Sequence, residues 1–349
     1  MKKLIALLLA LVLVLGMVAC GAKTPAKKTI YVLVPNPDHG WTGAIGVAAQ
    51  EKTDALNAEG KYNVVMQTFA TADDQIKQIE DIIANNPGDG SIGVAMLPVG
   101  NDVENAIQQL VDAGIPYTAA DRIIPSVAPS AVSNVKYDNV EIGAAAASYL
   151  VANGLKEGDK VAVIEGDGSS ADTDRTDGFN KYLLGEVAYM GEYIATPWTS
   201  LDSVSYSGAT GWNPANAQAW FETYLSNADN ADTRYIASWD DGLSCGVFEA
   251  LAGSAIDESV KATFLAGAPF ITGCGGAQVV YDTIAGDYTT YPVAEQFGGF
   301  MSVTYPPAMI QVTIQAMVDY FDGAEVLQDN TQSAECVDAT NVANYKGFN

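Results

Sequence analysis

The sequence predicts an α/β fold in which two doubly wound parallel-sheet lobes are joined by a three-strand hinge. Short apolar runs rich in β-branched residues alternate with amphipathic stretches along most of the chain. The runs are apolar throughout, which is typical of parallel strands covered by helices on both faces. The alternation restarts near residue 139, and a chain of 349 residues is long enough for two domains.

Individual elements follow from these periodicities. The predicted strands include Ile30–Val34, Tyr62–Thr68, Ile92–Leu97, Val161–Ile164 and Tyr235–Ser238. Apolar residues at helical spacing predict helices over Asp74–Ala84 and Val103–Val111, and a further helix over Asn139–Asn153 opens the second lobe.

The predicted lobes are each built from two pieces of chain. One lobe is expected to contain residues 29–135 and 304–333, and the other residues 136–303 and 334–349. The hinge strands are then expected near Asn134–Tyr137, Ser302–Tyr305 and Thr331–Val337.

The N-terminus predicts an exported lipoprotein. Lys2 and Lys3 precede an apolar run from Leu4 to Val18, which is short for a membrane span and fits a signal peptide over residues 1–19. The order Met17-Val18-Ala19-Cys20 resembles a bacterial lipobox, so Cys20 is the predicted lipidation site and residues 20–28 the tether. An ordinary secretory signal with an incidental cysteine is the alternative.

Composition excludes some function classes. The chain has 42 acidic and 17 basic residues, a net charge of −25, and no basic cluster beyond the tether. We therefore expect no nucleic-acid binding, because phosphates require a concentrated lysine and arginine face.

The three remaining cysteines, Cys245, Cys274 and Cys336, do not have the spacing of a metal site. They are compatible either with one disulfide plus a free thiol or with three reduced thiols. No cofactor and no metal are expected.

Chemistry-bearing residues cluster after the predicted strands, at the sheet edge where doubly wound folds bind ligands. They are His39 and Trp41 after the first strand, Asp121 and Arg122, Tyr137 to Asn139, Thr173 and Arg175, Trp212, and Asp240 and Asp241. Carboxylates, amides and guanidinium groups pair with sugar hydroxyls, and tryptophan rings pack on the C–H faces of a sugar. The set therefore suits a carbohydrate.

Each of these residues also has a purely structural interpretation. A loop tryptophan is often a buried anchor, and adjacent Asp121 and Arg122 could be a surface pair. Asn139 could be the N-cap of the helix that follows it, and Asp240 with Asp241 could cap the helix that starts at Gly242. The common position after strands favours the binding interpretation.

Taken in order, the motifs resemble those of the type I periplasmic sugar-binding family over nearly the whole chain after the tether. The matching stretches are Asp38–Gly43, Leu97-Pro98, Ile115-Pro116 through Asp121-Arg122, Tyr137–Asn139 with Gly143, Arg175–Phe179, Trp212, and Ser238–Asp241 with Gly246.

The resemblance implies roles for individual residues. Trp41 and Trp212 would sandwich a sugar ring, Asp121 and Arg122 would hold hydroxyl groups, and Tyr137 and Asn139 would contact the ligand near the hinge. Asp240 and Thr173 stand at family ligand positions that usually hold Asn and Arg, whereas Arg175 matches a general motif arginine. His39 and Tyr305 complete the predicted site.

The chain also departs from the pattern of the family's ribose-binding members. Leu97 replaces a polar contact, Tyr305 replaces a glutamine, and Gly267–Phe270 lacks the family's late ligand aspartate. We therefore expect a small sugar or polyol as the ligand, without assigning ribose.

The resemblance implies a monomeric solute-binding subunit of an ABC importer, outside the cytoplasmic membrane, with a permease and its ATPase as partners and the lipid as its only membrane contact. A chemotaxis or two-component sensing role would use the same fold and pocket. A carbohydrate-active enzyme is the weaker alternative, because the chain lacks a GxSxG elbow, a Walker loop and a GxGxxG turn at the first strand.

Overall fold

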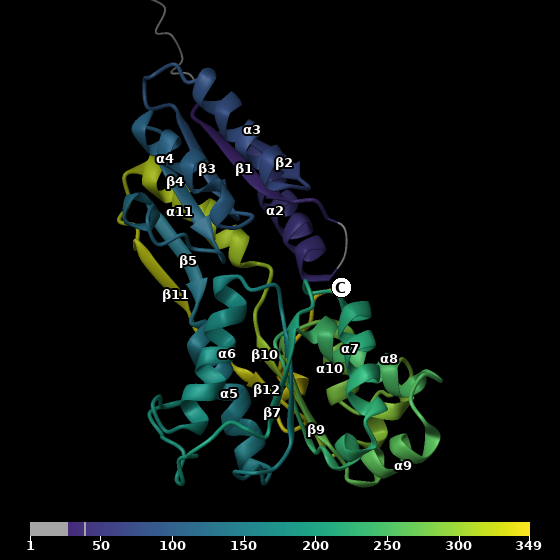
Figure 1. Cartoon of the computed structure of the whole chain (residues 1–349). Helices are drawn as coiled ribbons and strands as arrows, with labels where there is room; N and C mark the ends of the chain where they lie inside the picture. Colours follow the sequence, from purple (N-terminus) through teal and green to yellow (C-terminus); the bar gives the residue numbers. More distant parts are fainter. Residues whose placement is uncertain (1–26, 38–39) are drawn as a thin grey trace, which may run out of the picture.

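The structure is a computed structural model that describes residues 27–37 and 40–349. It contains two α/β lobes, each built on a six-stranded sheet, and Figure 1 shows the N-terminal lobe above the C-terminal lobe. The predicted fold class is confirmed. The predicted signal peptide, Cys20, most of the tether and His39 lie outside the described residues.

The N-terminal sheet is parallel, with the strand order β11-β5-β4-β3-β1-β2. Its strands are β1 (Thr29–Pro35), β2 (Asn63–Phe69), β3 (Ile92–Met96), β4 (Tyr117–Ala120), β5 (Ser133–Tyr137) and β11 (Asp329–Gln332). Every residue of β3 and of β4 is buried, as expected for central strands with helices on both faces.

Four helices cover this sheet: α2 (Gly40–Glu59), α3 (Ala72–Ala84), α4 (Glu104–Asp112) and α11 (Met309–Asp322). Helices α2 and α11 share one hydrophobic cluster with the sheet, and α3 and α4 share another. A capping box between Thr71 and Asp74 begins α3, which satisfies two backbone N–H groups at its start. Short 3₁₀ turns lie at Asn101–Val103 and Ala128–Ser130.

The C-terminal sheet has the order β12-β10-β9-β8-β6-β7, in which only β12 runs antiparallel to its neighbour. Its strands are β6 (Val161–Glu165), β7 (Val204–Ala209), β8 (Tyr235–Ser238), β9 (Phe270–Gly275), β10 (Gly299–Thr304) and β12 (Cys336–Val337).

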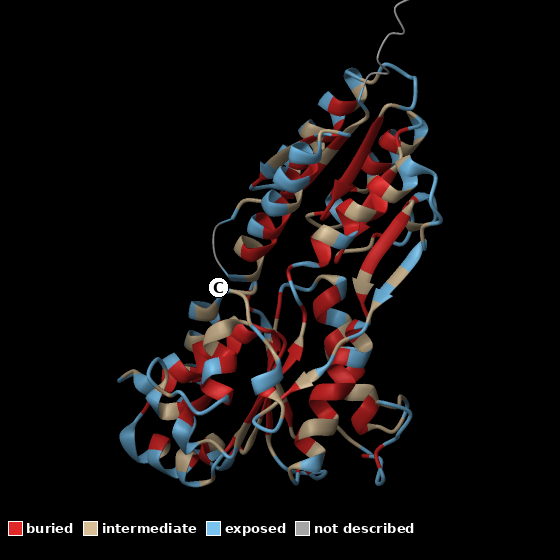
Figure 2. Cartoon of the chain, turned by 180° about the vertical axis from the view of Figure 1, so that it is seen from behind, coloured by how far each residue is buried: buried red, intermediate tan, exposed pale blue. Residues whose placement is uncertain are grey.

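Helices α5 (Asn139–Ala152) and α6 (Ser170–Leu183) pack on one face of this sheet, with α7 (Pro214–Ser226), α8 (Asp241–Ala252), α9 (Glu258–Ala266) and α10 (Gln278–Ile284) on the other side. Three 3₁₀ turns lie at Ala228–Asp232, Pro292–Gln296 and Val342–Asn344. Figure 2 shows buried residues concentrated in the strands and inner helix faces of both lobes.

The chain passes between the lobes three times: from β5 to α5, from β10 to α11 and from β11 to β12. Strand β5 stays paired with the N-terminal sheet as far as Tyr137, two residues beyond the predicted boundary at 135. One hydrophobic cluster includes residues of both lobes at these crossings, among them Met301, Val303 and Tyr305.

The strands and helices predicted from periodicity are present, with their ends shifted by at most two residues. The predicted hinge strand Ser302–Tyr305 corresponds to the second half of β10 and the start of its crossing, and Thr331–Val337 is not one strand but the end of β11, a connection and β12. The N-cap of α5 is Asp138, whose side chain accepts the N–H of Glu141, so the alternative of Asn139 as the cap is wrong. Asn139 is instead the first residue of the helix. Strand β7 was not predicted, because it follows a turn-rich stretch and is mostly half-buried or exposed.

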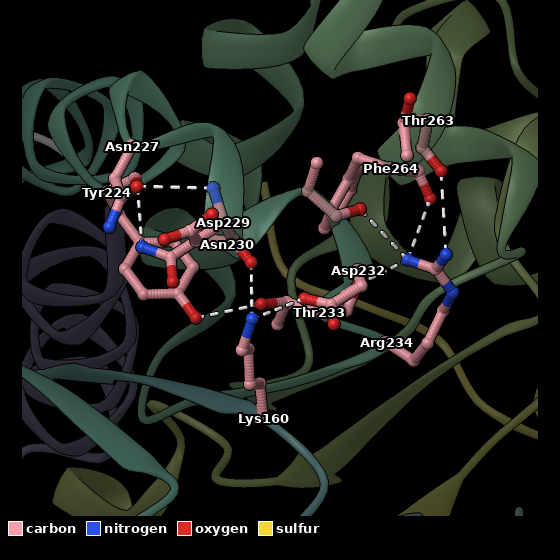
Figure 3. A network of polar contacts seen from close by, with 11 residues as sticks. Lys160, Tyr224, Asn227, Asp229, Asn230, Asp232, Thr233, Arg234, Thr263 and Phe264 are labelled. Atoms are coloured by element: carbon pink, nitrogen blue, oxygen red, sulfur yellow. Dashed lines mark hydrogen bonds and ion pairs between the residues drawn. The ribbon is translucent and has the colours of Figure 1, made fainter.

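A polar network fastens the 3₁₀ turn Ala228–Asp232 of the C-terminal lobe, near the starts of β6 and β8 (Figure 3). Lys160 donates to the Asp232 carboxylate at 2.7 Å and also to the Asp229 carbonyl. The Arg234 guanidinium donates to the carbonyls of Ala231 and Thr233 at 3.1 and 2.9 Å, and reaches carbonyls in the last turn of α9. A cation there satisfies carbonyls that the helix leaves unpaired.

Candidate functional site

A cavity of about 300 Å³ lies between the two lobes, at the carboxyl ends of their parallel strands. This is where doubly wound sheets bind ligands. The lining residues come from both lobes and from the β10–α11 crossing: Gly40, Trp41, Thr42, Asp121, Arg122, Asp167, Ser169, Ala171, Arg175, Gly211, Trp212, Pro214, Asp240, Gly242, Cys274 and Tyr305.

Trp41, at the start of α2, forms part of the N-terminal wall. Its indole Nε1–H donates to the carbonyl of Tyr305 at 2.7 Å, and the centroids of the two rings lie 5.4 Å apart. The hydrogen bond and the ring contact fix the orientation of an aromatic surface that remains half-buried. Such a surface can pack against an apolar face of a ligand.

Asp121 and Arg122 follow β4 on the same wall. Asp121 has φ of 63°, a left-handed conformation that costs free energy in a residue other than glycine and is common at functional sites. Its Oδ1 accepts a hydrogen bond from the Tyr305 hydroxyl, and its Oδ2 lies 3.8 Å from Arg122 Nε. Arg122 also donates to the carbonyl of Val99. Both predicted residues therefore face the cavity.

Trp212 forms the opposite wall, in the turn before α7. It also has a left-handed backbone, with φ of 57°. Its ring lies over Gly166, where an added Cβ atom would come within 2.2 Å of Trp212 Cζ2, so a glycine is required at that position. The two tryptophans predicted to sandwich a ligand thus line one cavity from different lobes.

Arg175 lines the cavity and is only 4% exposed. Its Nε donates to Asn139 Oδ1 at 2.9 Å, and an Nη donates to the carbonyl of Trp239. The guanidinium carbon lies 4.5 Å from the centre of the Tyr305 ring and 5.6 Å from that of Trp212. The sequence matched Arg175 only to a general motif arginine, whereas the structure places it among the lining residues of the cavity.

Close helix packing positions Arg175. A Cβ atom on Gly143 of α5 would lie 1.9 Å from the Arg175 carbonyl oxygen, and one on Gly178 of α6 would lie 2.0 Å from the Val140 carbonyl oxygen. The two glycines therefore let the backbones of α5 and α6 approach closely, and this approach brings Asn139 within reach of Arg175.

Asp240 and Asp241 follow β8 and have different tasks. Asp240 lines the cavity, and its Oδ1 accepts the N–H of Gly242 at 2.7 Å. Burial of its carboxyl group, followed by the neighbouring charge of Asp241, raises the pKa of Asp240 to about 7. The buried Asp241 accepts hydrogen bonds from the backbone of Gly276 and Ala277 and from Ser302 Oγ, at 2.6–2.8 Å, which makes it the structural member of the pair.

Cys274, at the end of β9, is a buried part of the cavity lining. Its burial raises the pKa of the thiol to about 12, so the thiol stays protonated at neutral pH. Cys245, Cys274 and Cys336 are all free thiols, which decides between the two alternatives left open by the sequence. Cys274 and Cys336 are both paired with Val303 and so are separated by strand β10.

Three predicted ligand residues do not line the cavity. The Thr173 side chain is exposed on α6 and donates to the Ser169 carbonyl at 3.1 Å. Tyr137 is buried behind Tyr305, with ring centroids 4.8 Å apart, and Asn139 is buried as the acceptor of Arg175. Tyr137 and Asn139 therefore support lining residues, whereas the Thr173 side chain lies on the exposed face of α6, opposite to the expectation.

Sequence reasoning missed Asp167, Ser169 and Cys274 as lining residues. Asp167 lies in a glycine-rich turn after β6, and Cys274 lies in an apolar strand without a motif. The available signal was the position of Asp167 and Ser169 after a strand and of Cys274 at the end of one. An isolated aspartate, serine or cysteine does not indicate ligand binding until folding brings its partners close.

The cavity can hold a compact, polyhydroxylated molecule. The Asp121 and Asp240 carboxylates can accept hydrogen bonds, the Arg122 and Arg175 guanidinium groups can donate them, and two indole rings offer apolar faces. Across residues 27–37 and 40–349, no group of three or more His, Cys, Asp or Glu side chains is arranged to hold a metal ion. Among these same residues, no helix is long and apolar enough to span a membrane.

Two hinged α/β lobes with an interlobe cavity, walled by aromatic residues from both sides, define a two-lobed binding protein. A family model described as periplasmic binding protein domain matches residues 30–325. Because the match covers most of the chain, the protein belongs to this family, whose type I members bind sugars.

Solved structures with the same fold include three two-lobed proteins. The Caulobacter myo-inositol binding protein is 17% identical, with a TM-score of 0.70, over 92% of this chain and 96% of that one. A solute-binding protein of an ABC transporter from Mycobacterium smegmatis, with bound glycerol, is 18% identical, with a TM-score of 0.70, over 93% and 98%.

The periplasmic component of the arabinose ABC transporter from Shewanella sp. ANA-3 is 15% identical, with a TM-score of 0.68, over 90% and 93%. These similarities establish the fold. Among curated proteins, none matches the chain.

Proposed function

We propose that this protein is the extracytoplasmic solute-binding lipoprotein of an ABC importer and binds a small sugar or polyol between its lobes. One observation carries the proposal: Trp41 and Trp212 line the same cavity from opposite lobes, together with carboxylate and guanidinium groups. Rings of this kind pack on the C–H faces of a sugar while the polar groups bind its hydroxyls.

The comparisons support the chemical class. The family is one of solute-binding proteins, and related structures were solved with arabinofuranose, glycerol and myo-inositol bound. These ligands are small, neutral and rich in hydroxyl groups. The cavity, with carboxylates and guanidinium groups in similar number, suits such a ligand better than a strongly charged one.

Binding would proceed by closure of the lobes around the solute. The solute first contacts one wall, and closure adds the contacts of the other wall, so it stabilises the closed form by its differential affinity. The closed form would then dock on the permease and its ATPase. The protein would act as a monomer, without cofactor and without catalysis, held to the membrane through lipid on Cys20.

A thermal-shift screen tests the solute class. A soluble form beginning after Cys20 is heated with pentoses, hexoses, deoxy sugars, polyols and nucleosides, and a bound solute raises the melting temperature by mass action. Amino acids serve as the contrast panel. A response to amino acids and to none of the sugars or polyols would refute the proposed class.

The tryptophans provide a sharper test. Trp41→Ala and Trp212→Ala should each weaken binding of the identified solute by on the order of 1–3 kcal/mol, because each removes a stacking surface. Isothermal titration calorimetry measures the effect. Trp220→Ala, which changes a half-buried tryptophan of the α7 core region, is the matched control and should leave the affinity unchanged. Normal binding by both wall variants would show that no sandwich exists.

The anchor is tested separately. Cells fed a labelled fatty acid should incorporate it into the wild-type chain and not into Cys20→Ser, which should be released from the membrane fraction. Incorporation into the variant would rule out Cys20 as the acylated residue.

A further inference from the structure

Asp167 is a cavity residue to which no role has yet been given. It follows β6 in the turn of residues 166–169 of the C-terminal lobe and lines the same cavity as Trp212. Its side chain is 28% exposed. The contacts of the Asp167 carboxyl group indicate its role.

The turn that carries Asp167 is held rigidly. The buried Asp172 carboxylate accepts the N–H groups of Gly166 and Gly168, each at 2.7 Å. The N–H of Ser169 donates to Asp167 Oδ1 at 3.0 Å, which orients the Asp167 carboxylate. Its Oδ2 atom is therefore presented in a fixed direction.

Besides the Ser169 N–H, Asp167 faces Trp212 within its own lobe and Arg122 across the cleft. Within the lobe the Trp212 side chain lies close to the Asp167 carboxyl group, and Gly211 N donates to the Gly166 carbonyl at 2.7 Å, which joins the two turns. Across the cleft, Asp167 Oδ2 lies 3.5 Å from Arg122 Nη2. The other ion pairs of the described residues each lie within one lobe, so this pair is the one that joins the two lobes.

We propose that Asp167 is a positioning residue that holds the Trp212 ring in place and ties it, through Arg122, to the opposite lobe. The inference rests on the lobe closure of the proposed function, but it concerns the protein before any solute binds. Removal of this carboxylate should make the Trp212 ring less ordered and the closed arrangement less populated.

The Arg122–Asp167 ion pair can form when the lobes are closed and not when they are separated. When the lobes separate, Arg122 keeps its bonds to Val99 and Asp121, which belong to its own lobe, and loses only Asp167. The pair therefore contributes to the closed arrangement alone. Because both side chains are partly exposed, the contribution is that of a partly screened ion pair, a few-fold in population.

The test measures the interlobe distance in the full-length protein in detergent, without added solute. Spin labels on non-canonical amino acids replace exposed residues Val47 of α2 and Ala219 of α7, one in each lobe. Pulsed electron paramagnetic resonance then gives the closed and open populations. We expect Asp167→Asn to lower the closed-to-open ratio by about threefold. A wild type with no closed population, or an unchanged ratio in Asp167→Asn, overturns the proposal.

Three further arms separate the ion pair from a general loss of structure. Asp177→Asn removes the same charge from an exposed position of α6 and should leave the ratio unchanged. In an Arg122→Gln background, Asp167→Asn should have no additional effect, since the pair is already absent. Raising the salt concentration from about 50 mM to about 500 mM should lower the ratio in wild type and not in Asp167→Asn.

The Trp212 contact is read by fluorine NMR of protein labelled with 5-fluorotryptophan, in which Trp212→Phe identifies the resonance. Asp167→Ala should shift or broaden this resonance, whereas Asp167→Asn, which keeps an acceptor oxygen, should change it less. An unchanged Trp212 resonance in Asp167→Ala would overturn the positioning role. Because no arm uses a solute, failure here is distinguishable from failure of the proposed sugar binding.

Discussion

At the residue scale, Asp240 combines two roles that appeared as alternatives in the sequence. Its Oδ1 atom caps α8 through the Gly242 N–H, and the same residue lines the cavity. Burial and the adjacent Asp241 raise the pKa of Asp240 to about 7, so near neutral pH much of the carboxyl is protonated. A protonated carboxyl both donates and accepts, as asparagine does.

This elevated pKa predicts a pH-dependent stability difference between wild type and Asp240→Asn. The folded-state pKa exceeds the unfolded value of about 3.9, so the stabilising contribution is fully present at low pH and is lost as pH rises through about 7. The free energy of unfolding of wild type should therefore fall relative to Asp240→Asn between pH 4 and pH 8, by on the order of 2–4 kcal/mol.

Denaturant unfolding at several pH values measures the difference. Asparagine keeps the cap on Gly242, which separates the effect of charge from that of capping. Asp287→Asn, at an exposed site where a hydrogen bond from Thr289 lowers the pKa of the carboxyl, is the control and should show the opposite trend. A pH-independent difference for Asp240→Asn would contradict the assignment.

At the element scale, the α5–α6 contact determines where Arg175 lies. Gly143→Ala places a Cβ atom 1.9 Å from the Arg175 carbonyl, and a backbone atom cannot move aside without shifting the helix. We expect a loss of about 2–3 kcal/mol in the free energy of unfolding, measured with denaturant, together with weaker solute binding.

Gly43→Ala is the control for this change. It lies within α2 and meets no atom closer than 3.9 Å, so it should leave stability unchanged or raise it slightly. Full stability in Gly143→Ala would mean that the two helices can separate without cost.

The helices and strands also show how much of the fold and of the candidate site could be predicted from the sequence. Apolar runs such as Ile92–Leu97 report burial on both faces of a sheet and were read correctly, whereas the half-exposed edge strand β7 carries no such signal. Trp41 and Asp121 were found because they follow strands, and Trp212 was supported by the family resemblance. Asp167 was missed because its partners Arg122 and Trp212 are 45 residues distant in the chain and become neighbours only after folding.

The sequence also could not show the neighbours of Tyr137 and Asn139, which were predicted to contact the ligand. In the structure Tyr137 lies behind the Tyr305 ring and Asn139 accepts from Arg175, so both act on residues of the cavity lining. A motif shows that a polar residue is near a site. Which atoms it faces depends on side chains supplied by other elements.

At the scale of the whole molecule, three crossings connect the two lobes, and the site lies beside these crossings. Tyr305, on the β10–α11 crossing, has its hydroxyl on Asp121, its carbonyl on the Trp41 indole and its ring on Arg175. Burial, followed by the charge of Asp121, raises the pKa of Tyr305 well above its ordinary value, so its hydroxyl remains a donor. Tyr305 therefore links both walls of the cavity to the hinge.

From this arrangement we predict that solute binding compacts the molecule and stabilises it in the same titration. At a solute concentration about 100 times the dissociation constant, the stabilisation is about 2.7 kcal/mol, which for a chain of this size raises the melting temperature by about 3–5 °C. Small-angle X-ray scattering on the form beginning after Cys20 should show a smaller radius of gyration with the same midpoint.

Tyr305→Phe keeps the ring and removes the hydroxyl bond to Asp121, so it should weaken binding while compaction at saturation remains. Stabilisation without compaction would mean that the solute binds to lobes already held closed, and that the crossings do not act as a hinge.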